Sequence, residues 1–262
     1  NLIKNNIITI NGSSSAGIVL AGSNETTAAS SNVLLNNRVD LLAPSNRAID
    51  FTFHQFDESV DGNASNNNFT NLRINIYAIN GTYFRTNNGS TNNTFYNLTI
   101  GSLNGSLNFL QDINLEFDSE ISTRELVVSF NRSFINSTDI GQFNKSARII
   151  LYNLTGLSNP GIRVAYNDSD FEVCPPPGCN TLDYNPTSGT FTFNVSHFTT
   201  YSIQETNTAP QITFLSQTPD TLTSRNLYAE HLVINYSFVD TNLNASTVEL
   251  FFKVNSTEGI DG

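Results

Sequence analysis

Basic side chains are scarce in this sequence. Its 262 residues include 12 Lys and Arg against 23 Asp and Glu, which gives a net charge of −11, and only 13% of the residues are charged. The only lysines are Lys4, Lys145 and Lys253. Because nucleic-acid binding requires clustered Lys and Arg, this composition argues against a nucleic-acid partner. With so few charges, we expect Asn, Ser and Thr to cover most of the surface.

Long hydrophobic runs are also absent. The sequence has no run of about eighteen apolar residues, so no segment is expected to span a membrane. A secretory signal peptide is missing as well, and the sequence starts inside a patterned segment and stops just after an expected strand. We therefore expect both ends to be cut from a longer polypeptide, and any membrane contact to be made by parts of the chain beyond residues 1–262.

Helical periodicity is missing throughout. Hydrophobic residues make up 38% of the chain, with 19 Phe and 9 Tyr, which is enough to build packed cores. The apolar positions alternate, and Thr, Val, Ile, Phe and Tyr dominate them. The sequence therefore predicts an all-β fold.

Cysteine occurs only twice, at Cys174 and Cys179, on either side of Pro-Pro-Pro-Gly. In an exported protein this spacing favours a small local disulfide. The alternative is a metal or redox pair, although two thiols alone supply half of a zinc site.

The abundant feature is the triplet Asn-X-Ser/Thr, the acceptor pattern for N-linked glycans. With 39 Asn and 56 Ser plus Thr in the chain, random order would yield roughly eight such triplets, and eighteen are present. An AT-rich genome would also enrich Asn, but it should enrich Lys equally, which it does not. We therefore expect covalent N-glycans. The candidate acceptors are Asn11, Asn24, Asn63, Asn68, Asn80, Asn88, Asn92, Asn97, Asn104, Asn131, Asn136, Asn144, Asn153, Asn167, Asn194, Asn235, Asn244 and Asn255.

Strand periodicity offers a check on these acceptors. In residues 190–196 the apolar side chains alternate with polar ones, which places Asn194 on the outward face. The same alternation places Asn235 outward. Asn11, Asn80, Asn88 and Asn104 each precede glycine, so turns are expected there. This order favours exposure more directly than it favours glycosylation, because Asn and Ser are surface residues in any case.

A repeat runs through residues 1–53. Asn5-Asn6 recurs as Asn36-Asn37, Ile10 as Leu41, and Ile18 as Ile49, always 31 residues later. A constant offset between strand-sized clusters predicts stacked coils, with asparagine side chains bonding from coil to coil at a turn. The pattern, in which Asn-X-Ile repeats precede Gly-Ile-X-Leu, resembles the last rungs of a NosD-like right-handed parallel β-helix.

From residue 54 to 204 the pattern indicates an antiparallel β-sandwich that contains the cysteine loop. Residues 71–86 form two alternating runs around Asn80-Gly81, which predicts a β-hairpin. The strand within 191–203 is similar to the closing strand of domains in exported archaeal proteins. Residues 205–262 resemble, from the lead-in Asn-X-Ala-Pro-X-Ile at 207–212, the start of an immunoglobulin-like or fibronectin-like module of prokaryotic surface proteins, with three strands expected at 211–219, 231–242 and 246–255.

Candidate catalytic chemistry is weak. A β-helix can carry a polysaccharide lyase or hydrolase, which needs clustered carboxylates and bases on one face. The simplest interpretation of the charged residues in and just after the repeat is that they face solvent. These residues are Arg38, Asp40, Arg47, Asp50, His54, Asp57 and Glu58.

Two acidic alternations are weak calcium candidates. Calcium takes six to eight oxygen ligands, so three carboxylates on one strand form an incomplete shell, and a solvated polar face is the usual explanation of such a pattern. The candidates are Glu116, Asp118 and Glu120, then Asp168, Asp170 and Glu172, and a loop position at Asp240 with Asn242. The histidines, His54, His197 and His231, show no metal spacing, and His197 is expected to be packed or at an edge.

These observations together predict an extracellular, N-glycosylated, non-catalytic surface protein of archaeal type. We expect it to be a subunit of a filament, sheath or S-layer-like array, with copies of itself as partners and no cofactor except possible calcium. The alternative is a carbohydrate-active enzyme or carbohydrate-binding adhesin built on the β-helix.

Overall fold

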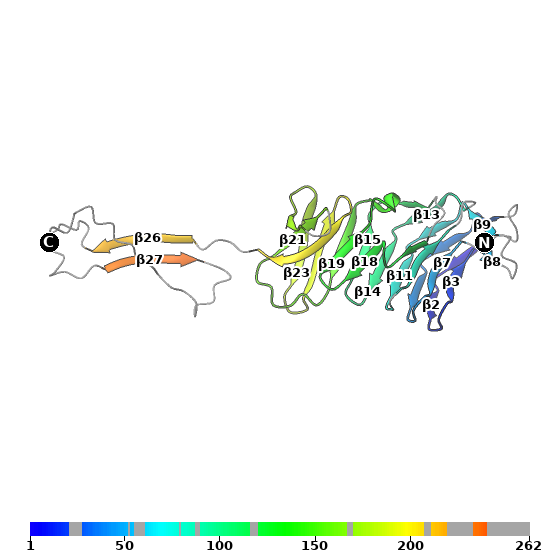
Figure 1. Cartoon of the computed structure of the whole chain (residues 1–262), viewed down its shortest axis with the longest axis horizontal. Helices are drawn as coiled ribbons and strands as arrows, with labels where there is room; N and C mark the ends of the chain where they lie inside the picture. Colours follow the sequence, from blue (N-terminus) through cyan, green and yellow to red (C-terminus); the bar gives the residue numbers. More distant parts are fainter. Residues whose placement is uncertain are drawn as a thin grey trace. The chain divides into compact units, whose positions relative to one another are not determined.

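The computed structural model describes residues 1–20, 28–51, 53–54, 61–78, 80–86, 90–115, 120–166, 170–206, 211–218 and 233–239. The chain divides into two compact units, Asn1–Gln204 and Glu205–Gly262. Within the described residues all regular structure is β, apart from the short 3-10 helix η1 (Gly141–Phe143), so the predicted all-β fold class is confirmed (Figure 1).

The first unit begins with coils that contribute strands to three sheets, here named sheets A, B and C. Sheet A takes its strands in the order β1-β5-β10-β13-β16, sheet B begins β2-β6-β11-β14, and sheet C contains β3, β7, β12 and β17. The coil strands are β1 (Leu2–Lys4), β2 (Ile7–Ile10), β3 (Ala16–Val19), β5 (Val33–Leu35), β6 (Arg38–Leu41), β7 (Arg47–Asp50), β10 (Asn68–Thr70), β11 (Arg73–Ile76), β12 (Thr82–Arg85), β13 (Asn93–Tyr96) and β14 (Thr99–Ser102).

Successive coils pair in parallel, which is the arrangement of a parallel β-solenoid. Ile10 pairs with Leu41 and Ile18 with Ile49, as the 31-residue repeat predicts. The next pairings continue this order: Val33 pairs with Asn68 at an offset of 35, and Asn68 with Thr94 at an offset of 26. Leu34, Phe69 and Phe95 stack in register inside sheet A and are almost fully buried.

Asparagines stack from coil to coil at the turns, which confirms the predicted coil-to-coil bonding. On the outside, Asn36 donates to Asn5, Asn71 donates to Asn36, and Asn97 donates to Asn71, with N···O distances of 3.1, 2.8 and 2.7 Å. These four residues have positive φ, between 52° and 58°, a conformation that asparagine tolerates better than most residues. We call this row the outer asparagine ladder. A buried ladder of Asn32, Asn67 and Asn93 runs inside the coils.

The end of the parallel region lies later than predicted. The expected antiparallel start at residue 54 is wrong, because β10 to β14 pair in parallel with the coils before them. The chain then reverses, and one antiparallel strand pairs with the last coil strand of each sheet. These strands are β15 (Gly105–Phe109) on β14, β16 (Ile113–Leu115) on β13 and β17 (Glu120–Ser122) on β12. The change of offset from 31 to 35 and 26 residues hid the later coils from the repeat.

The hairpin predicted at Asn80-Gly81 is also wrong. The strands on either side, β11 and β12, belong to sheets B and C and do not pair with each other. Asn80 has φ +57°, so it forms a corner of the coil. Asn-Gly signals a tight change of direction, and here that change passes from one sheet of the solenoid to the next.

The rest of the first unit is antiparallel. Sheet B continues through β15, β20, β24 and β23, and a further sheet, sheet D, has the order β18-β19-β25-β21-β22. Their buried residues belong to a single hydrophobic cluster with those of the coils, which fits a β-sandwich fused to the solenoid. The strands are β18 (Leu126–Ser129), β19 (Arg132–Ile135), β20 (Ala147–Leu151), β21 (Pro160–Ala165), β22 (Glu172–Val173), β23 (Cys179–Asn185), β24 (Thr190–Val195) and β25 (Thr200–Glu205).

A row of phenylalanines joins the two parts of this core. Ring centroids are 4.9 Å apart for Phe95 and Phe84, 6.0 Å for Phe84 and Phe143, 5.5 Å for Phe143 and Phe109, and 5.9 Å for Phe109 and Phe198. All five rings are buried. The coils and the antiparallel sheets therefore share one core within the unit Asn1–Gln204.

Two smaller sheets complete the described strands. β4 (Ala28–Ser30) pairs in parallel with β9 (Asp61–Ser65), which pairs with β8 (Phe53–His54). In the second unit β26 (Gln211–Thr218) pairs antiparallel with β27 (Val233–Val239), where the first two strands of the immunoglobulin-like module were expected. The third expected strand, at 246–255, lies outside the described residues.

Candidate functional site

The candidate acceptors differ in what their side-chain amides do. An N-glycan is attached to the Nδ2 atom, so a usable acceptor must present that atom to solvent. Asn11, Asn68, Asn80 and Asn153 are exposed, and within the described part of the chain their side chains make no hydrogen bond. Asn144 is exposed and accepts a hydrogen bond from the Phe198 amide through Oδ1.

Other acceptors use Nδ2 to hold the fold. Asn131 donates to the Ile203 carbonyl and accepts from the Ile203 amide, both at 2.8 Å, so it clamps β25. Asn97 belongs to the outer asparagine ladder, and Asn92 donates to Asn66 at 3.3 Å. Asn136 donates to Asp139 at 2.7 Å.

The alternation predicted around Asn194 is present. Phe191, Phe193 and Val195 are buried, whereas Asn194 is half-buried and accepts from the Arg148 guanidinium at 3.5 Å. Asn104 is half-buried at a turn. The structure describes the backbone of Asn63 and Asn235 but not their side chains. The remaining acceptors lie outside the described residues; they are Asn24, Asn88, Asn167, Asn244 and Asn255.

The predicted disulfide is present between Cys174 and Cys179, whose Cα atoms are 5.9 Å apart. It closes the loop between β22 and β23, and Cys179 is buried against the core cluster. Both sulfur atoms are used in this bond, so neither can bind a metal ion in this state.

The carboxylates weighed as catalytic candidates are not brought together. Asp40 lies on sheet B, accepts from Arg38 at 2.9 Å and from Asn75 at 2.6 Å, and is 6% exposed. The hydrogen bond to Asp40 raises the pKa of Arg38. Asp50 lies on sheet C with Arg47 at 3.7 Å and Arg85 at 3.9 Å. Each carboxylate is thus held by basic or amide partners on its own sheet, while Asp57 and Glu58 lie outside the described residues.

The calcium candidates are only partly described. Glu116, Asp118, Asp168, Asp240 and Asn242 lie outside the described residues. Glu120 accepts a hydrogen bond from Thr82, while Asp170 and Glu172 are exposed. Among the described residues there is no group of three or more His, Cys, Asp or Glu side chains that could hold a metal ion.

Of the histidines, only His197 has a described side chain. Its ring stacks on Tyr166, with centroids 6.4 Å apart and an interplanar angle of 9°. His197 is half-buried, which agrees with the expected packed or edge position. The side chain of His54 and the whole of His231 lie outside the described set.

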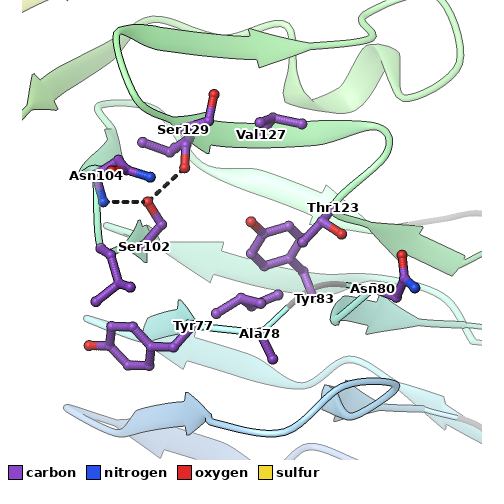
Figure 2. A pocket seen from close by; sticks show the side chains of 12 residues that line it. Tyr77, Ala78, Asn80, Tyr83, Ser102, Asn104, Thr123, Val127 and Ser129 are labelled. Carbon is purple, nitrogen blue, oxygen red and sulfur yellow. Dashed lines mark hydrogen bonds between the residues drawn. The ribbon is translucent and has the colours of Figure 1, made fainter.

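A pocket that the sequence did not predict opens between the coils and the first antiparallel strands, and we call it the coil–cap pocket. Its volume is about 380 Å³, within the range of small-molecule sites. Figure 2 shows Asn80 and Asn104 on either side of Tyr83, and Ser102 joining two segments through its hydroxyl. The lining residues are Ile76, Tyr77, Ala78, Asn80, Tyr83, Ser102, Leu103, Asn104, Thr123, Val127, Val128 and Ser129.

The wall of the coil–cap pocket is held by backbone contacts. Ser102 Oγ donates to the Val128 carbonyl at 2.6 Å and accepts from the Asn104 amide at 3.1 Å, which ties the β14–β15 turn to β18. Tyr83 is 2% exposed, and its burial raises the pKa of the hydroxyl, so this group stays protonated. The only sequence signal was a pair of tyrosines on either side of Asn80-Gly81.

A second, polar pocket of about 340 Å³ adjoins the first at Asn80. Glu120, Arg124 and Glu125 contribute its charges. Glu125 Oε2 accepts from the amide and hydroxyl of Ser122, at 2.9 and 2.8 Å. Glu120 and Glu125 are thus partly satisfied by neighbouring hydroxyl groups.

No protein-family model matches the chain, and no curated protein matches it at a significant level. No helix in the described ranges combines the length and the apolar character needed to cross a bilayer.

Proposed function

We propose that this chain is part of an extracellular, N-glycosylated structural protein, a component of a cell-surface filament, sheath or S-layer-like array. The observation that carries this proposal is the placement of Asn11, Asn68, Asn80 and Asn153, whose side-chain amides are exposed and make no hydrogen bond among the described residues. The disulfide between Cys174 and Cys179 supports an oxidising, extracytoplasmic location. The proposal assigns no catalytic reaction and no cofactor to the chain.

Glycans would suit the physical chemistry of this surface. Only 13% of the residues are charged, so hydration depends on neutral polar groups. Sugars on exposed acceptors add hydrated bulk, hinder proteases and cover sheet edges that could otherwise pair with other chains.

The first unit is compatible with a role in assembly. Its coils and its antiparallel sheets share one hydrophobic core, and a packed unit of this kind suits a structural component. The proposed partner is another copy of the same protein.

The archaeal origin and the NosD-like relationship belong to the same proposal. The NosD-like relationship rests on the Asn-X-Ile and Gly-Ile-X-Leu pattern, and stacked outer asparagines support it. The archaeal origin rests on the similarity of the strand within residues 191–203 to the closing strand of domains in exported archaeal proteins.

Two measurements on native material test the proposal. The mass of the segment should exceed the 28.8 kDa of the bare polypeptide by several kilodaltons, and electron microscopy of the cell surface should show a repeating array labelled by an antibody to this chain. A native mass equal to that of the polypeptide would remove the glycoprotein claim. Finding the protein only as dispersed monomers would remove the assembly claim.

A further inference from the structure

We propose that the coil–cap pocket binds one unit of a neutral sugar. The proposal is independent of whether the acceptors are glycosylated, because it rests on the pocket itself. It can therefore be tested on protein that carries no glycan.

The lining of the pocket selects for a neutral ligand with both apolar and hydroxyl-bearing faces. None of its twelve lining residues is charged. Ile76, Leu103, Val127 and Tyr77 supply apolar and aromatic surface, while hydroxyl and amide groups lie around them. A sugar ring presents C–H groups on one face and hydroxyls at its edge, which matches a lining of this kind.

Tyr83 supplies the directional contact. Its side chain is almost fully buried in β12, and Figure 2 shows its ring inside the group of lining side chains. Within the described residues the hydroxyl makes no hydrogen bond, although it borders the pocket. The hydroxyl is not one of the solvent-inaccessible polar atoms that lack a partner, so water can reach it, and a ligand hydroxyl would replace that water. Because burial raises the pKa of Tyr83, the group remains a donor over the physiological pH range.

Two candidate glycan acceptors lie at the rim of the pocket. Asn80 and Asn104 both border the pocket, and both are followed by Gly and then Thr or Ser, so both are candidate acceptors. A sugar attached at either residue would begin at the edge of the pocket. The bound unit can therefore come from the chain's own glycan or from a saccharide in solution, and both share the same chemistry.

The direct test uses the full chain, produced in a host without N-glycosylation and labelled with 15N. Methyl glycosides of glucose, galactose, mannose and N-acetylglucosamine are added while amide spectra are recorded. At least one should produce saturable shifts centred on the amides of Tyr83, Asn104 and Val128. The absence of saturable shifts for all four, and for oligosaccharides released from native material, would overturn the proposal.

Point variants separate the pocket from unspecific binding. Tyr83→Phe removes only the hydroxyl and should weaken binding about three- to tenfold, the range of one neutral hydrogen bond. The matched control is Tyr96→Phe, because Tyr96 is exposed on β13 in sheet A and does not line the pocket; the affinity of this variant should stay within about twofold of wild type. Val127→Phe, which fills the pocket from a half-buried strand position, should abolish binding.

Equal affinity for wild type, Tyr83→Phe and Val127→Phe would contradict the assignment even if sugar binds elsewhere. Thermal unfolding of each variant checks that the fold is retained. Should Val127→Phe fail to fold, the pair of tyrosine variants still decides the question.

Native glycosylated protein then distinguishes the two sources. If the chain's own glycan fills the pocket, added sugar binds only after Asn80→Gln or Asn104→Gln. If the ligand comes from solution, the native protein binds it as tightly as the unglycosylated one does.

Discussion

The buried asparagine ladder predicts a large and specific loss of stability on substitution of Asn67. This side chain is fully buried and makes four hydrogen bonds. Oδ1 accepts from the backbone amide and Nδ2 of Asn32, at 2.9 and 2.8 Å, and Nδ2 donates to the Ala29 carbonyl and to Asn93 Oδ1, both at 2.9 Å. The side-chain amide of Asn67 therefore joins three consecutive coils.

Asn67→Ala removes all four bonds and leaves buried donors on Asn32 without their acceptor. At about 1 kcal/mol for each lost bond, the free energy of unfolding should fall by about 4 kcal/mol. For a unit of this size the midpoint temperature should then fall by about 8–16 °C. The measurement is thermal and urea unfolding followed by circular dichroism on unglycosylated protein.

The matched control lies one turn away in the outer asparagine ladder. Asn71→Gly removes two exposed hydrogen bonds, to Asn36 and from Asn97, and glycine keeps the positive φ of 52°. Its cost should be about 1 kcal/mol or less, because water replaces the lost partners. A loss for Asn67→Ala no greater than that for Asn71→Gly would refute the view that the buried ladder joins the coils.

Further predictions concern the antiparallel part. Replacing Cys174 and Cys179 together by alanine should cost about 2 kcal/mol, because the disulfide closes a very short loop, and loss of a much larger amount would contradict this entropic account. Gly189→Ala should lower the free energy of unfolding by about 2–4 kcal/mol, since φ is +63° and an added Cβ would meet backbone atoms. Gly156→Ala, at φ +83° in open space, should lower it by about 1 kcal/mol. Equal losses for the two variants would exclude a steric origin. Asn131→Ala should cost about 2–4 kcal/mol from its two hydrogen bonds to β25 and its positive φ, and an unchanged unfolding midpoint would show that the clamp does not stabilise the fold.

The first two coils could be predicted because they repeat in the amino-acid sequence at a constant spacing. Asn5 and Asn36 stack in the structure at the same 31-residue spacing that relates them in the sequence. The third and fourth coils escaped prediction because their spacings differ, so Asn71 and Asn97 did not align with the first pair. A solenoid tolerates such changes, since extra residues enter at its corners while the strand register is kept.

Other features depend on contacts between distant segments. Asn80-Gly81 encodes a turn. It does not encode the pairing of β12, whose partners β7 and β17 are distant in the sequence. The coil–cap pocket arises where the β14–β15 turn meets β18, a contact that neither segment encodes alone. Acceptor triplets are readable from sequence, yet the hydrogen bonds of Asn131 to a residue 72 positions away are not.

Exposed asparagines of this chain should carry glycans in its native setting. Site-resolved mass spectrometry of peptides from native protein tests this most directly. We predict sugar on Asn11, Asn68, Asn80 and Asn153, and none on Asn131, whose side chain clamps β25. Unmodified peptides at all four exposed positions, or full occupancy of Asn131, would contradict it.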